Sequence, residues 1–241
     1  LDKEDYVWVP AENAGSRTNG NIGINALSCT NIDFESGTTA GWVQTNGFNP
    51  LFNATGCCTL TNQIDQTIMT GGTDALGGFP RVFPGGGNFS LRLGSTAVGG
   101  RADRIEQTFF VTPTNANFTY RYAVVLNDGG HALASQPRFT IEMLDTLGNQ
   151  VPCTFYNVSA GSNIAGFQTS TVTGNVIYKT WTNVAIDLTP NIGQNVTLRF
   201  TVFDCGPSGH YAYAYIDGTC TNFATSVSDT ACPNIPIPMC G

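Results

Sequence analysis

Two short stretches decide the fold: FTYRYAVVL at residues 118–126 and YAYAYID at residues 211–217. Both are rich in aromatic and aliphatic residues, which suit the pleated surface of a sheet. In the second stretch Tyr211, Tyr213 and Tyr215 alternate with small or aliphatic residues, which is the two-residue period of a strand. We therefore expect both stretches to be strands of a β-sandwich.

Similar short runs recur along the chain and are separated by glycine-rich turns. Long helices are not expected, because charged residues make up only 11% of the 241 residues. The sequence predicts an all-β jelly-roll sandwich over residues 29–222, with a long surface loop over 61–84. The further predicted strands are 41–45, 89–93, 106–112, 138–145, 180–187 and 196–203.

The eight cysteines indicate disulfide bonds and an oxidising, extracellular or cell-surface location. None of them has C-x-x-C zinc spacing, and their pairing is open. The sandwich is predicted to have extended, disulfide-bearing arms at both ends, with an N-terminal arm or linker over 1–28 and a Cys/Pro-rich C-terminal arm over 223–241. These arms are expected to contact neighbouring domains or subunits. The predicted disulfide residues are Cys29, Cys57, Cys58, Cys153, Cys205, Cys220, Cys232 and Cys240.

The acidic composition excludes nucleic-acid binding. At a net charge of −7, the chain has few cationic side chains to neutralise a run of phosphates. No apolar run of about 18 residues occurs, so no membrane-spanning helix is predicted. The chain begins with Leu and shows no signal-peptide pattern, so we expect a processed segment of a longer precursor.

Three acidic residues are candidate metal ligands: Asp33 and Glu35 in the DFESG motif at 33–37, and Asp217 in YAYIDG at 213–218. The first and last strands of a jelly roll lie side by side, so these carboxylates can converge. They would repel unless a hard cation lay between them, and Ca²⁺ prefers such oxygen ligands. The sequence predicts a structural calcium ion. The alternative is that these residues only start a strand and cap a turn.

The DFESG motif followed by Gly41-Trp42, the SLRLG strand at 90–94 and the late YID resemble the superfamily of calcium-stabilised carbohydrate-binding modules and MAM-type ectodomains. A closer resemblance is to jelly-roll domains of secreted surface adhesins of gliding Bacteroidetes, which are cargo of type IX secretion. It is carried by RADRI at 101–105, FTYRYAVVL at 118–126, QPRF at 136–139 and GHYAYAYID at 209–217. The resemblance covers residues 29–222 and implies export, surface display and attachment.

Tyr211, Tyr213 and Tyr215 share one face of their strand and are the candidate ligand-binding residues. If that face points outward, the rings can stack on sugars. If it points inward, it is ordinary core, which is the favoured interpretation.

Other polar residues are assigned structural roles. Arg121 and Arg138 lie in apolar runs and need partners, for which Asp103, Glu106 and Glu142 are available. His131 and His210 lie in glycine-flanked loops without metal-binding spacing, which favours loop hydrogen bonds over a metal site.

The sequence also predicts a protein that is not an enzyme, because it has no G-x-S-x-G, H-E-x-x-H or P-loop motif. Glu35, Glu106, Glu142 and Asp204 could supply a pair of catalytic carboxylates, but nothing selects one pair. Asp145-Thr146-Leu147 and Asp229-Thr230-Ala231 fit a D-[ST]-apolar signal, which predicts O-glycosylation at Thr146 and Thr230.

Two functions follow for such a chain. The first is an extracellular structural or adhesion module of a larger surface protein or filament, whose arms contact neighbouring subunits. The alternative is a carbohydrate-binding module, whose partners are glycans. In one form of this alternative the module is accessory to a secreted hydrolase.

Overall fold

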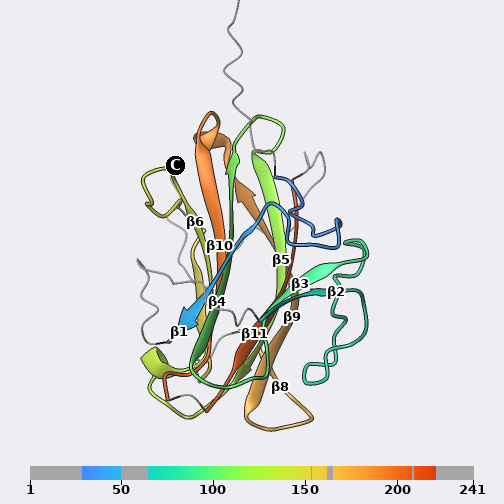
Figure 1. The fold of residues 1–241 in the computed structure, drawn as a ribbon, viewed down its shortest axis with the longest axis vertical. Coiled ribbons are helices and arrows are strands. Elements are labelled where there is room, and N and C mark those ends of the chain that lie inside the picture. Colours follow the sequence, from blue (N-terminus) through green and yellow to red (C-terminus); the bar gives the residue numbers. More distant parts are fainter. Residues whose placement is uncertain (1–28, 50–64, 153, 162–164, 208, 221–241) are drawn as a thin grey trace, which may run out of the picture.

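The computed structural model describes residues 29–49, 65–152, 154–161, 165–207 and 209–220. These residues form two antiparallel sheets packed face to face, with the strands running nearly parallel to the long axis (Figure 1). Consecutive strands cross repeatedly from one sheet to the other, as in a jelly roll. The predicted all-β sandwich is confirmed.

The first sheet has five strands in the order β1-β4-β10-β6-β7. Every pair in it is antiparallel. Its strands are β1 (Val43–Phe48), β4 (Arg101–Phe110), β6 (Arg138–Leu144), β7 (Tyr156–Ser159) and β10 (Asn195–Phe203).

The second sheet has six strands in the order β2-β3-β11-β5-β9-β8 and is also antiparallel. Two short 3-10 helices, η1 (Leu133–Ser135) and η2 (Thr189–Asn191), lie in connections. The strands of this sheet are β2 (Gln66–Met69), β3 (Ser90–Gly94), β5 (Asn117–Asn127), β8 (Gln168–Thr169), β9 (Val176–Asp187) and β11 (Ala212–Thr219).

Each of the eight predicted strands overlaps an observed one, but three short strands were missed. The predicted loop over 61–84 is wrong in part, because β2 lies inside it and pairs with β3. The strands β7 and β8 are also too short to show a period of their own.

The main core fills the space between the sheets. On β10 the inward residues Val196, Leu198 and Phe200 are almost fully buried, whereas Thr197 and Arg199 face outward. Phe118, Tyr120 and Tyr122 on β5 contribute to the same core from the opposite sheet. Strand alternation therefore places aromatic side chains from both sheets in one layer.

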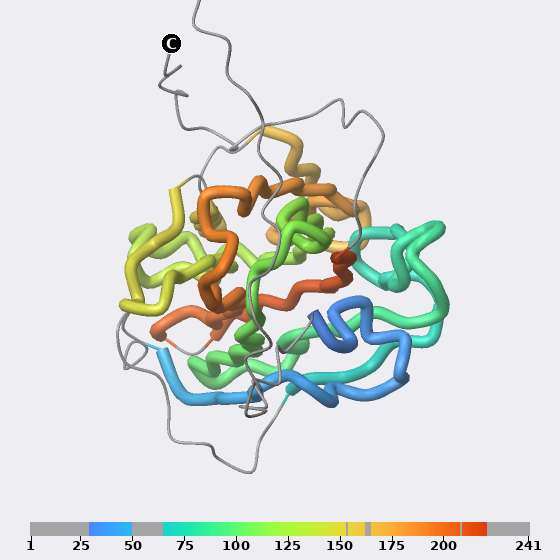
Figure 2. Tube along the Cα trace, turned by 90° about the horizontal axis from the view of Figure 1, so that it is seen from above, coloured from blue at the N-terminus to red at the C-terminus, as the bar shows by residue number. Residues whose placement is uncertain are grey.

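A second core lies on the outer face of the six-stranded sheet. It contains Val125, Tyr213 and Tyr215 of the sheet and Phe79 of residues 71–84, the covering segment. This segment follows β2 and loops beside the red strand β11 (Figure 2). Both faces of β5 and β11 are consequently buried, which explains why both sequences are so apolar.

A disulfide joins Cys29 to Cys220 and closes the sandwich. The prediction that Cys205 forms a disulfide is wrong, because this residue is a free, buried thiol. The other five cysteines and both predicted arms, 1–28 and 223–241, lie outside the described residues.

Two buried carboxyl groups, Asp103 on β4 and Asp204 after β10, lie close to each other. Burial raises the pKa of each to about 7, and the nearby Arg101 opposes the rise. Asp204 accepts hydrogen bonds from the backbone N–H of Arg101 at 3.1 Å and of Ala212 at 3.2 Å. Asp103 accepts one from the N–H of Asp65 at 3.2 Å. The folded chain thus retains protons that the unfolded chain releases near pH 4.

We expect the free energy of unfolding to rise as the pH falls from 8 to 5, by on the order of 3 kcal/mol. A carboxyl group whose pKa is higher in the folded protein than in the unfolded chain stabilises the fold. This stabilisation is complete below the pKa of the unfolded chain and is lost as the pH rises through the folded pKa of about 7. Urea denaturation at the two pH values measures the difference. Asp204→Asn should markedly reduce the difference in unfolding free energy between the two pH values. A parent protein that is equally stable at both pH values would contradict the expectation.

Candidate functional site

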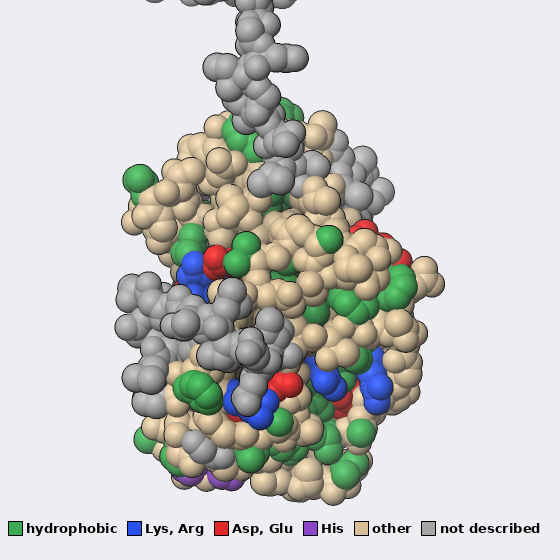
Figure 3. Space-filling view, viewed as in Figure 1, with side chains coloured by type: hydrophobic (Ala, Val, Ile, Leu, Met, Phe, Trp, Pro, Cys, Tyr) green, Lys and Arg blue, Asp and Glu red, His purple; other side chains and the backbone are tan. Residues whose placement is uncertain are grey.

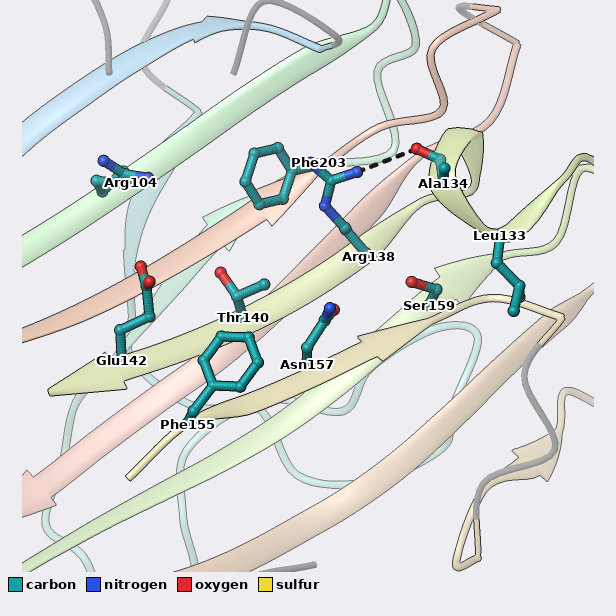
Figure 4. Close-up of a pocket in the computed structure, with 10 residues that line it drawn as sticks. All are labelled: Arg104, Leu133, Ala134, Arg138, Thr140, Glu142, Phe155, Asn157, Ser159 and Phe203. Atoms are coloured by element: carbon teal, nitrogen blue, oxygen red, sulfur yellow. Dashed lines mark hydrogen bonds between the residues drawn. The ribbon is translucent and has the colours of Figure 1, made fainter. Parts of the chain in front are cut away.

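The outer face of the five-stranded sheet carries a hollow of about 550 Å³, called here the sheet hollow (Figure 4). Its floor comes from β4, β6, β7 and β10, and one wall comes from η1. It is lined by Arg104, Leu133, Ala134, Arg138, Thr140, Glu142, Phe155, Asn157, Ser159 and Phe203.

Strand register explains why these side chains share one surface. Residues two apart on a strand point to the same face, and the register aligns them in rows across the sheet. The central row is Arg104, Thr201, Thr140 and Asn157. The rows on either side are Phe203, Arg138 and Ser159, and Glu106, Arg199 and Glu142.

Two phenylalanines give the hollow apolar surface. Phe155 precedes β7 and is 43% exposed, although it lies in a polar neighbourhood. Phe203 is buried beneath the guanidinium of Arg138, whose central carbon lies 4.0 Å from the ring centroid. Arg138 also donates a 3.3 Å hydrogen bond to the carbonyl of Ala134, so the arginine links the floor to the η1 wall.

Both glutamates of this face are paired with one arginine. Arg199 forms ion pairs with Glu106 at 2.7 Å and with Glu142 at 3.7 Å. Arg104 donates to the hydroxyl of Thr201 at 3.0 Å. Burial, and then the charge of Arg199, lower the pKa of Arg104 to about 10, so its side chain is still cationic at neutral pH. The hollow therefore offers many hydrogen-bond donors and acceptors.

Each of the predicted calcium ligands has another partner, and Asp33 accepts a hydrogen bond from the backbone N–H of Glu35 at 3.2 Å. The Glu35 carboxylate accepts hydrogen bonds from the backbone N–H groups of Asn88 and Phe89, both at 2.9 Å. Asp217 is fully buried, lies 3.3 Å from the Arg121 guanidinium and accepts from the N–H of Gly218. The expected partners of Arg121 were wrong, since its partner is Asp217.

One turn contacts both ends of this predicted site. Side chains added at Gly86 and Gly87 would collide with Asp217 and Glu35, respectively. Burial raises the pKa of Asp217 to about 6; Arg121 opposes this, and the charge of Asp33 adds to it. Calcium binding stays a prediction, which a comparison of thermal melting with and without chelator tests.

The predicted ligand-binding role of Tyr213 and Tyr215 is wrong, because both are buried in the second core, as the favoured interpretation expected. Their hydroxyls donate to Asp74 at 2.9 and 2.8 Å. Tyr211 is half-buried and stacks on Tyr213, with ring centroids 6.3 Å apart. Tyr213 and Tyr215 therefore cannot stack on a sugar, and ligand binding by Tyr211 stays a prediction.

Of the predicted glycosylation residues, Thr146 is exposed in the turn after β6, and Thr230 lies outside the described residues. Modification of either stays a prediction. No helix among the described residues is long and apolar enough to cross a membrane.

No family model and no curated protein matches the sequence. Among solved structures, TmCBM61 in complex with β-1,4-galactotriose is 10% identical, with a TM-score of 0.43, 78% of this chain covered and 92% of that one. The enzymatically active domain of bacteriophage CBA120 tailspike protein 4 is 16% identical, with a TM-score of 0.38, 81% of this chain covered and 22% of that one. The K3 adhesin domain of Lys-gingipain from Porphyromonas gingivalis is 17% identical, with a TM-score of 0.37, 77% of this chain covered and 93% of that one. These similarities include a binding module, an enzyme domain and an adhesin, and they do not choose among functions.

Proposed function

We propose that this chain is an extracellular, non-catalytic recognition module that binds neutral carbohydrate in the sheet hollow. The observation that carries the proposal is the exposed ring of Phe155 in a hollow lined by amide, hydroxyl and guanidinium groups. An exposed aromatic ring beside fixed polar groups is a common arrangement of small-ligand sites.

The chemistry of a sugar matches the two kinds of surface. One side of a pyranose ring presents C–H groups, which suit the face of Phe155. Its hydroxyls both donate and accept, as do the side chains of Thr140, Asn157 and Ser159. Both glutamates of this face are already paired with Arg199, and Arg138 lies over the ring of Phe203, so the ligand that we propose is neutral rather than ionic.

The same face supports binding rather than hydrolysis. Its two glutamates, Glu106 and Glu142, lie on either side of Arg199, which forms an ion pair with each. A glycosidase needs room for the scissile bond between its two carboxyl groups. In this protein the side chain of Arg199 fills the space between the two carboxyl groups.

Attachment to a glycan-bearing surface would give the adhesive role that the sequence suggests. Assembly with neighbouring domains or subunits through 1–28 and 223–241 stays a separate prediction, because both segments lie outside the described residues. Self-association that survives loss of glycan binding would favour this second role.

Replacing the exposed ring tests the proposal. We expect Phe155→Ala to weaken binding of the best glycan from an array by about tenfold, because stacking contributes up to about 1.5 kcal/mol. Titration calorimetry measures the change. Phe48→Ala is the matched control, since Phe48 is 47% exposed and does not line the hollow. Equal affinity of Phe155→Ala and the parent, or no glycan bound by the parent, would reject the proposal.

A further inference from the structure

Three side chains that bind soft and borderline metals meet at one end of the sandwich. His131 lies in the connection between β5 and β6, and Cys205 and His210 lie in the connection between β10 and β11. Both connections are at the lower end in Figure 1, where Figure 3 shows the histidines, in purple, at the surface. The sequence favours simple loop hydrogen bonds for these histidines and predicts a disulfide for Cys205.

Two of the three distances among these atoms match a tetrahedral metal ion, and the third is within 4.8 Å. His131 Nε2 lies 3.2 Å from His210 Nδ1, and Cys205 Sγ lies 3.5 Å from the same Nδ1. All three candidate ligand atoms lie within 4.8 Å of one another. With usual bond lengths of about 2.0 Å to nitrogen and about 2.3 Å to sulfur, tetrahedral zinc separates two nitrogens by about 3.3 Å and nitrogen from sulfur by about 3.6 Å.

The surroundings of Cys205 suit a bound thiolate. The sulfur is buried and accepts hydrogen bonds from the backbone N–H groups of Gly209 and His210, both at 3.1 Å. Donors of this kind stabilise negative charge on sulfur and fix the ligand in place. The backbone N–H of Cys205 also donates to the carbonyl of His210 at 3.0 Å, which tightens the turn that carries two of the three ligands.

A glycine makes the approach of the two imidazoles possible. A side chain at position 129 would collide with both His131 and His210. Asp128 is the nearby acidic residue of the same loop, and its carboxylate already accepts from Gln136 and from the N–H of Gly130. Protein ligands therefore fill three positions of the site.

We propose that His131 Nε2, His210 Nδ1 and Cys205 Sγ bind one Zn²⁺ ion, with the fourth position left to water. Two nitrogens and one thiolate form a donor set that zinc prefers over calcium or magnesium. The ion would tie the β10–β11 connection to the loop that carries Leu133 and Ala134, which form one wall of the sheet hollow. The inference rests on the three side chains alone and is independent of carbohydrate binding.

Cobalt(II) titration of the folded protein, purified free of metal, tests the site. Co²⁺ replaces zinc in tetrahedral sites and gives a sulfur-to-metal charge-transfer absorption when a thiolate binds it. We expect one equivalent to produce this band and a subsequent equivalent of Zn²⁺ to remove it. Zinc should also raise the melting temperature of the parent protein.

Variants connect the signal to these residues. Cys205→Ser should abolish the band, and His131→Ala should weaken binding at least tenfold while near-UV circular dichroism stays native. Ser135→Ala is the matched control in the same loop, because its side chain is not a ligand, and it should bind as the parent does. If Cys205→Ser does not fold, His131→Ala decides the question.

Two outcomes overturn the proposal. One is a parent protein that shows no charge-transfer band. The other is a band that Cys205→Ser and His131→Ala both keep, which would place the metal on other cysteines of the chain.

Discussion

Asp74→Ala is expected to lower the free energy of unfolding by about 3–5 kcal/mol, since it leaves several buried donors without a partner. Asp74 is only 4% exposed. Its carboxylate accepts from the hydroxyls of Tyr213 and Tyr215 and from the backbone N–H groups of Leu76 and Gly77. Hydrogen bonds to an ionised group are the stronger kind, each contributing about 1.5–3 kcal/mol.

The same carboxylate holds the covering segment on the sheet. Burial, and then the negative charge of Asp74, raise the pKa of Tyr213 and of Tyr215 well above the usual range, so both phenols stay protonated donors. Phe79 packs edge-on against Tyr215, with ring centroids 5.7 Å apart. Loss of the carboxylate should therefore loosen residues 71–84 as a unit.

Urea denaturation followed by tyrosine and tryptophan fluorescence measures this effect. Tyr213→Phe is the matched control, since it removes one donor and leaves the carboxylate with three. It should cost about 1 kcal/mol. If Asp74→Ala costs no more than Tyr213→Phe, the carboxylate does not organise the second core.

Opening the disulfide is expected to be costlier still. Cys29 and Cys220 are separated by 191 positions, so the bond encloses nearly the whole described sandwich. In the chain-entropy description, cross-linking a loop of this length removes unfolded-state entropy worth about 5 kcal/mol. The double variant Cys29→Ser/Cys220→Ser should lose stability of that order.

Denaturant midpoints of the parent and the double variant, both without reductant, measure this loss. Reductant should lower the stability of the parent by more than that of the double variant. A parent and variant of equal stability would show that the cross-link does not constrain the unfolded chain.

The strand pattern was predictable because alternation depends on local sequence. The second core was not predictable from the sequence. Periodicity shows that Tyr211, Tyr213 and Tyr215 share a face, but it does not show what covers that face. The covering segment is glycine-rich and has no period, and Asp74 reaches the two tyrosines from 139 and 141 positions away.

The sheet hollow was beyond sequence reasoning for a related reason. Its central row depends on the pairing of β4, β10, β6 and β7, and strand order is a property of the whole fold. The alternation of polar and apolar residues along β10 and β6 was the available signal of a polar outer face. It could not reveal that Phe155 would lie beside that row.

The most direct test of the carbohydrate proposal is a map of amide chemical-shift changes as an array-selected neutral oligosaccharide is titrated into the ¹⁵N-labelled protein. The proposal predicts that the largest changes fall on β6 and β7 and around Arg104, Phe155 and Asn157, with the outer face of the six-stranded sheet unaffected. Changes centred on the loops at one end of the sandwich, or none at saturating sugar, would contradict it.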